Sequence, residues 1–255
     1  MPQKIFSPTE EWSANAHVPS LDIYRERYQL STTDPEAFWS DIGQRLDWIK
    51  PWRTVRKFDF SKGDIKWFLG GKLNVSYNCI DRHIQNGHGD RTAILWEGND
   101  PNQSRAFSFI EILKEVSQFA NALRSLGVKK GDRVCLYMQM IPELAFAMLA
   151  CARIGAVHSV VFGAFSADSL RDRINDSKCK ILITQDTGVR GTKQNIPMKA
   201  NADNAVLETP SIKNVIVVRR TGEKVFMDNH RDIWWHEAVS GMDAVCELEE
   251  MDAED

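Results

Sequence analysis

Two cationic side chains three residues apart, Arg190 and Lys193, are the clearest candidates for chemistry in this sequence. They lie in segment 186–193, which follows a predicted strand. Arginine offers a planar fork of donors and lysine a compact point charge, while small neighbours such as Gly191 and Thr192 let a ligand approach the backbone. The pair therefore suits a phosphate, and each charge-assisted contact would contribute about 1.5 to 3 kcal/mol. The alternative, which spacing alone leaves open, is that both cations are solvated on a surface loop.

A second candidate segment, Phe162-Gly163-Ala164-Phe165-Ser166, follows another predicted strand. Ligands of open α/β sheets gather outside the carboxyl ends of the strands, so both segments are expected at the same sheet edge. Ser166 also caps a predicted helix, whose first N–H groups favour negative charge. The two segments together predict an anion site at that edge.

Several common catalytic motifs are missing from the sequence. Gly70-Gly71-Lys72 lacks the first glycine of a P-loop and is followed by leucine, and no G-x-G-x-x-G opens a helix. His236-Glu237 lacks the second histidine of a zinc protease, and no G-x-S-x-G elbow is present. The five cysteines are scattered and never spaced as C-x-x-C, which argues against a zinc site and a disulfide framework. These absences alone leave the function open, and they single out no residue as catalytic or as a metal ligand.

The elements that must position these segments alternate between strand and helix. Strands are predicted at residues 92–96, 133–138, 157–162, 180–184 and 213–219, and helices at 77–84, 108–123, 142–154 and 166–176. Strands separated by helices of this length need crossover connections. The expected fold class is therefore α/β, with a mostly parallel sheet and flanking helices.

The two ends of the chain have a different character. Residues 1–80 are rich in tryptophan and carry one helix signal, with Asp34 as N-cap before Pro35; the rest is expected to be an extended arm that packs on the main body. The predicted domains are thus 1–80 and 81–255. The last nine residues contain six acids and are expected to form a solvated tail.

Composition excludes some partners. The formal net charge is -3, so no global field attracts nucleic acid or an anionic membrane. No apolar run approaches the roughly 20 residues that span a bilayer, and the first residues lack the apolar core of a signal peptide. We expect a cytoplasmic protein that contacts neither nucleic acid nor membrane.

Longer motifs resemble a known family. They are Trp67-Phe68-Leu69-Gly70-Gly71-Lys72-Leu73-Asn74, Asp81-Arg82-His83, Gly131-Asp132-Arg133-Val134, Met140-Ile141-Pro142-Glu143 and the run from Ala152 to Gly163. Together they resemble the N-terminal portion of acetyl-CoA synthetases, the AMP-forming acetate–CoA ligases of the adenylate-forming superfamily. The resemblance covers nearly the whole chain. It implies the first part of that superfamily's large domain, preceded by the family's N-terminal extension.

The resemblance also implies roles for the candidate residues. The loop Arg190-Gly191-Thr192-Lys193 matches the family's R-x-x-[RK] contact with the 3′-phosphate of CoA, and the adenine of CoA is implied to lie against Phe162, Gly163, Ala164 and Ile196. Two residues depart from the pattern, because Ala164 and Thr192 stand where the family has smaller residues. Neither departure removes a charge.

The implied reaction uses acetate, ATP and CoA as small-molecule substrates, with Mg²⁺. Acetate first becomes acetyl-adenylate with release of diphosphate, and the CoA thiol then displaces AMP. In the family, the ATP phosphate loop follows sequence like residues 251–255, so we expect a truncated chain that is inactive alone and a monomeric complete enzyme. Two alternatives remain: a fragment of a ligase for propionate or another short acid, and a non-catalytic CoA-binding module.

Two other polar groups are interpreted as structural. His158 is expected inside a buried strand, where a satisfied histidine is more common than a general base. Asp81-Arg82-His83 is expected to fix the arm to the body and not to transfer protons.

Overall fold

The computed structural model describes residues 6–255 and contains two compact units. The first unit includes residues 6–72 and 252–255, and the second includes residues 73–251. The domain boundary that the sequence places near residue 80 remains a prediction.

The second unit is built on a five-stranded sheet. In spatial order its strands are β12 (Asp232–Trp234), β11 (Asn214–Val218), β8 (Ile181–Gln185), β6 (Arg133–Met138) and β7 (Val157–Phe162). Every neighbouring pair runs parallel. The predicted α/β class with a mostly parallel sheet is therefore confirmed.

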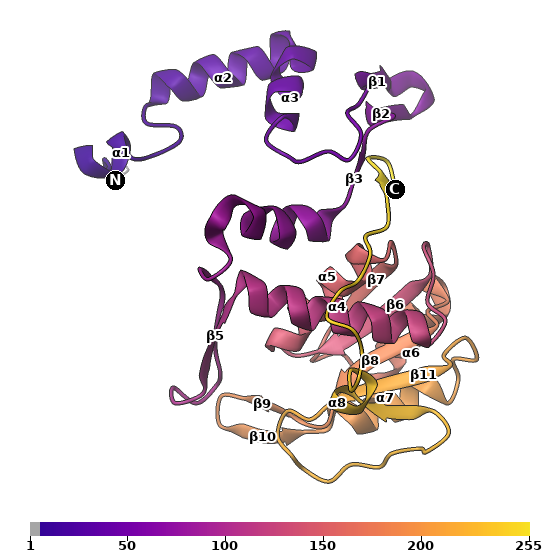
Figure 1. Cartoon of the computed structure of the whole chain (residues 1–255). Helices are drawn as coiled ribbons and strands as arrows, with labels where there is room; N and C mark the ends of the chain where they lie inside the picture. Colours follow the sequence, from indigo (N-terminus) through magenta and orange to yellow (C-terminus); the bar gives the residue numbers. More distant parts are fainter. Residues whose placement is uncertain (1–5) are drawn as a thin grey trace, which may run out of the picture. The chain divides into compact units, whose positions relative to one another are not determined.

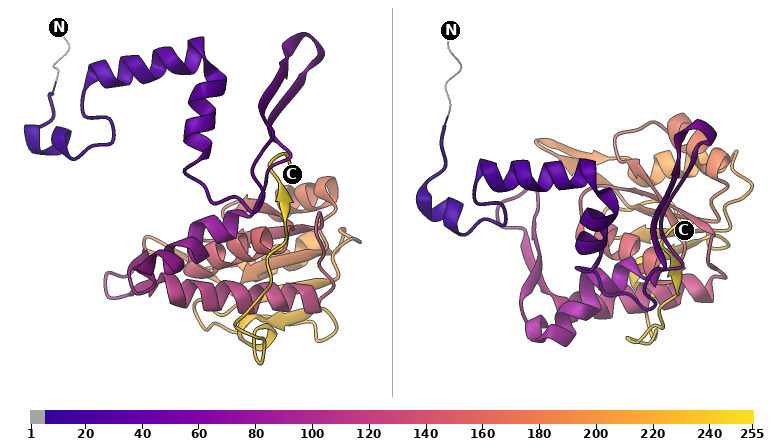
Figure 2. Two further views of the ribbon diagram at one scale, coloured as in Figure 1. Left: turned by 45° about the horizontal axis from the view of Figure 1, so that its top comes forward. Right: turned by 90° about the horizontal axis from the view of Figure 1, so that it is seen from above.

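Helices cover both faces of this sheet, because its inner strands are apolar on both faces (Figures 1 and 2). Val134, Leu136 and Met138 of β6 belong to the cluster built by α4 (Phe109–Ser125) and α5 (Pro142–Arg153). The intervening Cys135 and Tyr137 belong to the opposite cluster, with α6 (Ala167–Ser177) and α7 (Met198–Val206). This period of two produces a three-layer unit.

The helix starts follow the predicted caps. Ser108 Oγ accepts from the Glu111 N–H at 3.3 Å, and Glu111 Oε2 accepts from the Ser108 N–H at 2.8 Å, which is the complete capping box of α4. Gly127, with φ of 82°, lies just beyond the end of this helix. Pro142 starts α5, and Ser166 Oγ accepts from the Ser169 N–H at 3.4 Å to cap α6.

Strand β7 is the edge strand of the sheet, which corrects the expectation that His158 lies in a buried strand. Val157 is 52% exposed and Phe162 is 63% exposed. A continuous apolar run does not distinguish a central strand from an edge strand, because edge position depends on the order of pairing. Partial burial lowers the pKa of His158, so its imidazole is neutral at pH 7.

Smaller elements complete the second unit. Two antiparallel hairpins are present, β4 (Thr92–Glu97) with β5 (Ser104–Ser108) and β9 (Gly188–Arg190) with β10 (Lys193–Ile196). The helix predicted at 77–84 appears as two wide turns, η2 (Tyr77–Asp81) and η3 (Ile84–His88). Helix α8 (Trp235–Ala238) places the Trp235 ring 3.7 Å from that of Phe119.

Segment 81–83 makes structural contacts. Asp81 accepts two hydrogen bonds from the Arg153 guanidinium, at 2.9 and 3.1 Å, and the Arg153 side chain is 6% exposed. Arg153 Nε also donates to the Cys246 carbonyl at 2.9 Å. The His83 ring stacks on Phe109 at 4.8 Å. These contacts all lie within the second unit, so the expectation that Asp81-Arg82-His83 fixes the arm to the body remains a prediction.

The first unit has more regular structure than the sequence predicts. It contains α1 (Glu10–Ala14), α2 (Leu21–Thr33), α3 (Pro35–Gly43), β1 (Thr54–Asp59), η1 (Phe60–Lys62) and β2 (Asp64–Leu69). The Asp34 cap of α3 is confirmed, with its carboxylate accepting from the Ala37 N–H at 3.0 Å. The expectation of an otherwise extended arm is wrong, because Thr9 and Ser20 cap two further helices and β1 pairs with β2.

Tryptophans form the centre of the first unit. The Trp48 and Trp52 rings lie 4.9 Å apart, and each also contacts Phe68, at 5.4 and 5.0 Å. A Cβ on Gly43 would lie 2.8 Å from the Phe68 ring, so this glycine allows the close approach. The expected docking of the arm on the main body remains a prediction.

The acidic C-terminal segment is ordered by backbone pairing, so the expectation of a solvated tail is wrong. Within the second unit, the Glu249 N–H donates to the Arg153 carbonyl at 2.9 Å. Within the first, the Ala253 N–H donates to the Gly71 carbonyl at 3.2 Å, and Lys72 pairs with Asp252 at 2.7 Å. The short strands β3 (Lys72–Leu73) and β13 (Met251–Asp252) pair with each other. Acidic composition did not reveal these partners, which lie far away in the sequence.

Candidate functional site

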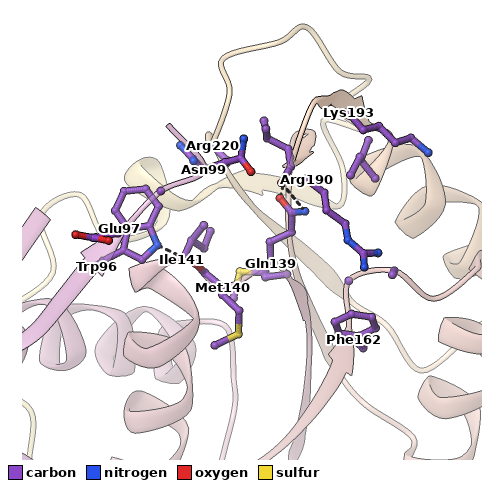
Figure 3. A pocket seen from close by; sticks show the side chains of 16 residues that line it. Trp96, Glu97, Asn99, Gln139, Met140, Ile141, Phe162, Arg190, Lys193 and Arg220 are labelled. Carbon is purple, nitrogen blue, oxygen red and sulfur yellow. Dashed lines mark hydrogen bonds between the residues drawn. The ribbon is translucent and has the colours of Figure 1, made fainter. Parts of the chain in front are cut away.

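A cavity of about 590 Å³ opens at the carboxyl ends of β6 and β7 in the second unit, within the range of small-molecule sites (Figure 3). The lining residues come from the β4–β5 turn, the ends of β6, β7 and β11, and the β9–β10 hairpin. They are Trp96, Glu97, Gly98, Asn99, Met138, Gln139, Met140, Ile141, Phe162, Gly163, Ala164, Val189, Arg190, Lys193, Ile196 and Arg220.

Most of the residues singled out from the sequence meet at this cavity. Six of the eight line it, namely Phe162, Gly163, Ala164, Arg190, Lys193 and Ile196. The other two, Gly191 and Thr192, form the turn of the hairpin and do not line the cavity. The structure thus brings together two segments that the sequence could place only at the same sheet edge. Their ligand remains a prediction.

The segment predicted as a loop around Arg190 is a β-hairpin. Arg190 and Lys193 are directly paired across its two strands. A two-residue turn joins them, and Gly191 has φ of 57°, a conformation that favours glycine. Residues paired in an antiparallel ladder start from the same face, and in Figure 3 the Arg190 side chain then runs towards Phe162 while the Lys193 side chain extends away from it.

This pair of cations has no acidic partner. Among residues 6–255, neither Arg190 nor Lys193 takes part in an ion pair, and both are exposed. Like charges that face each other across a hairpin destabilise it. An anion bound between them would remove this penalty. Figure 3 shows Arg190 reaching towards Phe162, whereas Asn99 and Arg220 lie on the other side of Gln139.

Two side-chain amides contact the backbone of β9 and of the turn that follows it. Gln139 Oε1 accepts from the Val189 N–H at 3.0 Å, and Gln139 Nε2 donates to the Val189 carbonyl at 3.2 Å. Asn99 repeats this arrangement with Gly191, where both hydrogen bonds measure 2.8 Å. The β4–β5 turn and the β9–β10 hairpin therefore lie side by side, as Figure 1 shows.

Neighbouring aromatic residues hold the apolar wall of the cavity in place. Phe162 packs edge-on against Phe165 at 5.9 Å, and the Tyr137 hydroxyl donates to the Phe165 carbonyl at 2.7 Å. Burial raises the pKa of Tyr137 above its ordinary value. A Cβ on Gly163 would lie 3.1 Å from the Met138 carbonyl oxygen, so a side chain there would press against the backbone at the end of β6.

The opposite wall contains residues that sequence reasoning missed. The Arg220 guanidinium lies 5.0 Å from the centre of the Trp96 ring, and the Trp96 indole N–H donates to the Met140 carbonyl at 2.8 Å. The fully buried Asp186 carboxylate accepts backbone N–H groups of Arg220, Thr221 and Gly222, at 2.8 to 3.1 Å, and holds this loop in place. The predicted end of β6 could have suggested residues 139–141, but no local signal brings the β4–β5 turn here.

None of the helices in residues 6–255 combines the length and apolarity needed to cross a bilayer. The same residues contain no group of three or more histidine, cysteine, aspartate or glutamate side chains arranged to hold a metal ion.

The fold matches that of a solved ligase. The chain superposes on acetoacetyl-CoA synthetase from Streptomyces lividans with a TM-score of 0.79 at 22% identity, covering 95% of this chain and 37% of that structure. The shared architecture is the adenylate-forming fold. At this identity the likeness concerns the fold alone.

Sequence comparison then identifies the family. Residues 81–253 match the family described as AMP-binding enzyme, and residues 24–79 match the acetyl-coenzyme A synthetase N-terminus. The chain belongs to the AMP-binding enzyme family.

Named relatives extend over nearly all of this chain. It is 50% identical over 252 residues to the acetyl-coenzyme A synthetase of Rubrobacter xylanophilus, covering 99% of this chain and 38% of the relative. It is 54% identical over 232 residues to acetyl-coenzyme A synthetase 2 of Pseudomonas putida, covering 91% of this chain and 36% of the relative. The chain therefore spans less than two fifths of the length of these relatives.

Proposed function

We propose that this chain is part of an AMP-forming acetate–CoA ligase and forms one wall of its CoA site. Arg190 and Lys193 bind the 3′-phosphate of CoA, with Gly191 and Thr192 forming the turn between them. Phe162, Gly163, Ala164 and Ile196 contact the adenine. The names of the relatives support the reaction, and the cavity supports the site.

One observation carries this assignment: two cations paired across a hairpin, without an acidic partner among the described residues, line a cavity that also has an aromatic wall. A ligand suited to it carries a compact dianion and a flat ring. The 3′-phosphate and adenine of CoA provide both groups. Arginine and lysine contribute a directional fork and a point charge to the phosphate.

The proposed reaction has two steps. Acetate attacks ATP to give acetyl-adenylate and diphosphate, and the thiol of CoA then attacks the acetyl carbon and displaces AMP. This chain's contribution is to hold the nucleotide end of CoA so that the thiol is oriented for the second step. We assign none of its residues to acetate, ATP or Mg²⁺. A cytoplasmic location and a monomeric complete enzyme belong to the same proposal.

The identity of the acid is the less constrained part of the proposal. A ligase for propionate or another short acid would use the same CoA wall, as would a CoA-binding module without catalysis. Acetate is preferred because the relatives at 50% and 54% identity are both named acetyl-coenzyme A synthetases.

Binding of CoA and dephospho-CoA to the 255-residue chain, measured by calorimetry, tests the site. The two ligands differ only in the 3′-phosphate. CoA should bind at least about tenfold more tightly, since the contact is charge-assisted. Equal affinities for the two ligands would reject the assignment of Arg190 and Lys193.

A further inference from the structure

The outer edge of β9 is satisfied by side chains instead of a third strand. Successive residues of a strand direct their backbone groups to opposite sides. Arg190 and Gly188 face β10, so Val189 between them faces away from it, and Gly191 follows in the turn. An edge of this kind normally leaves its N–H and C=O groups to solvent. Here the amides of Gln139 and Asn99 bond both backbone groups of Val189 and Gly191, respectively.

This arrangement clamps the residues on either side of Arg190. We propose that Asn99 and Gln139 are positioning residues that hold the β9–β10 hairpin so that Arg190 and Lys193 meet the 3′-phosphate of CoA. The inference rests on the proposed function, because it gives these amides a role through the two cations. Neither amide needs to touch the phosphate.

The Gln139 amide is itself fixed in place. Gln185 Nε2 donates to Gln139 Oε1 at 3.3 Å and to the Thr187 carbonyl at 2.9 Å, and the Gln139 backbone N–H donates to Gln185 Oε1 at 2.8 Å. A Cβ on Gly188 would lie 2.6 Å from Gln139 Oε1, so the glycine leaves the space that the amide occupies. The position of the Gln139 amide therefore depends on residue 188 of β9 being a glycine.

Asn99 offers the cleaner test, because it is exposed and its two hydrogen bonds both go to Gly191. Water can hydrogen-bond the Gly191 backbone in place of Asn99, so the stability of the fold should change little. Water does not, however, hold the turn in one orientation. Asn99→Ala should therefore leave the fold intact and release the turn. Asn102→Ala is the matched control, since Asn102 lies in the same turn and its side-chain amide donates to Asp100 Oδ1 at 3.1 Å.

The measurement is the ratio of the affinities for CoA and dephospho-CoA in the 255-residue chain. Asn99→Ala should lower this ratio about three- to tenfold, because a hairpin that is free to reorient places the cations in the phosphate-binding position for a smaller fraction of the time. The affinity for dephospho-CoA and the melting temperature should stay nearly unchanged, and Asn102→Ala should keep the wild-type ratio. Exchange of the Gly191 amide hydrogen should become faster in Asn99→Ala.

Four outcomes would overturn the inference. An unchanged ratio in Asn99→Ala, an equal loss for both ligands, an unchanged exchange rate at Gly191, or the same loss in Asn102→Ala would show that Asn99 does not position the cations. A wild-type chain without preference for CoA would instead reject the proposed function itself. The two failures are thus distinguishable.

Discussion

Removal of the Arg190 side chain is the most informative perturbation of the proposed site. Arg190→Ala deletes one of the two cations that face each other across the hairpin and line the cavity. The substitution lies at an exposed position and breaks no ion pair among the described residues, so we expect the fold to be unchanged. Any loss of binding then reports on the ligand contact.

The size of the loss can be bounded. A hydrogen bond to a charged group contributes about 1.5 to 3 kcal/mol, which corresponds to about 10- to 150-fold in affinity. Arg190 is exposed, so screening by solvent places the effect near the lower limit. We therefore expect about tenfold weaker binding of CoA and less than twofold weaker binding of dephospho-CoA.

Calorimetric titration of both ligands at low and at moderate salt provides the assay. The preference for CoA should shrink as salt rises, because the contact is between exposed charges. Lys224→Ala is a suitable control, since it removes one exposed positive charge from a residue that does not line the cavity. Equal losses for both ligands in Arg190→Ala, or the same loss in Lys224→Ala, would refute the phosphate contact.

Three other predictions concern stability and activity. Asp81→Asn should lower the free energy of unfolding by about 3 to 5 kcal/mol in denaturant titrations, because it leaves the buried guanidinium of Arg153 without its carboxylate; a loss below about 1 kcal/mol would contradict this. Burial acts to raise the pKa of Asp232, but hydrogen bonds from Arg231 and Lys199 outweigh it and lower the pKa. Its stabilisation is therefore present above the ordinary carboxyl pKa and lost as the pH falls below it through the lowered pKa of the folded state, so the deficit of Asp232→Asn should shrink in acid, and a constant deficit would argue against the mechanism. The 255-residue polypeptide alone should show no ATP–diphosphate exchange, and robust exchange by homogeneous protein would refute our expectation.

Much of the second unit could be predicted from local sequence. The capping box of Ser108 and Glu111, Pro142 at a helix start and the apolar runs of β6 and β8 act through neighbours in the chain, and the structure confirms them. The edge position of β7 could not be predicted, since it depends on which strands pair. Strand β12 was missed because three residues give little periodicity.

The candidate site could be predicted only in part, because some of its contacts join segments that are far apart in the sequence. Arg190 and Phe162 follow strands that end at one sheet edge, so their proximity follows from topology. The direct pairing of Arg190 with Lys193 depends on a hairpin that the small residues of the segment did not reveal. Asn99 reaches the hairpin from a turn 92 residues away in the sequence, and no local pattern encodes that contact.

A structure of the chain with adenosine 3′,5′-bisphosphate, the nucleotide portion of CoA, would test the assignment most directly. We predict the 3′-phosphate within hydrogen-bonding distance of both the Arg190 guanidinium and the Lys193 ammonium, with the adenine against Phe162. A nucleotide bound elsewhere, or one whose 3′-phosphate lies on the Arg220 side of the cavity, would contradict the account.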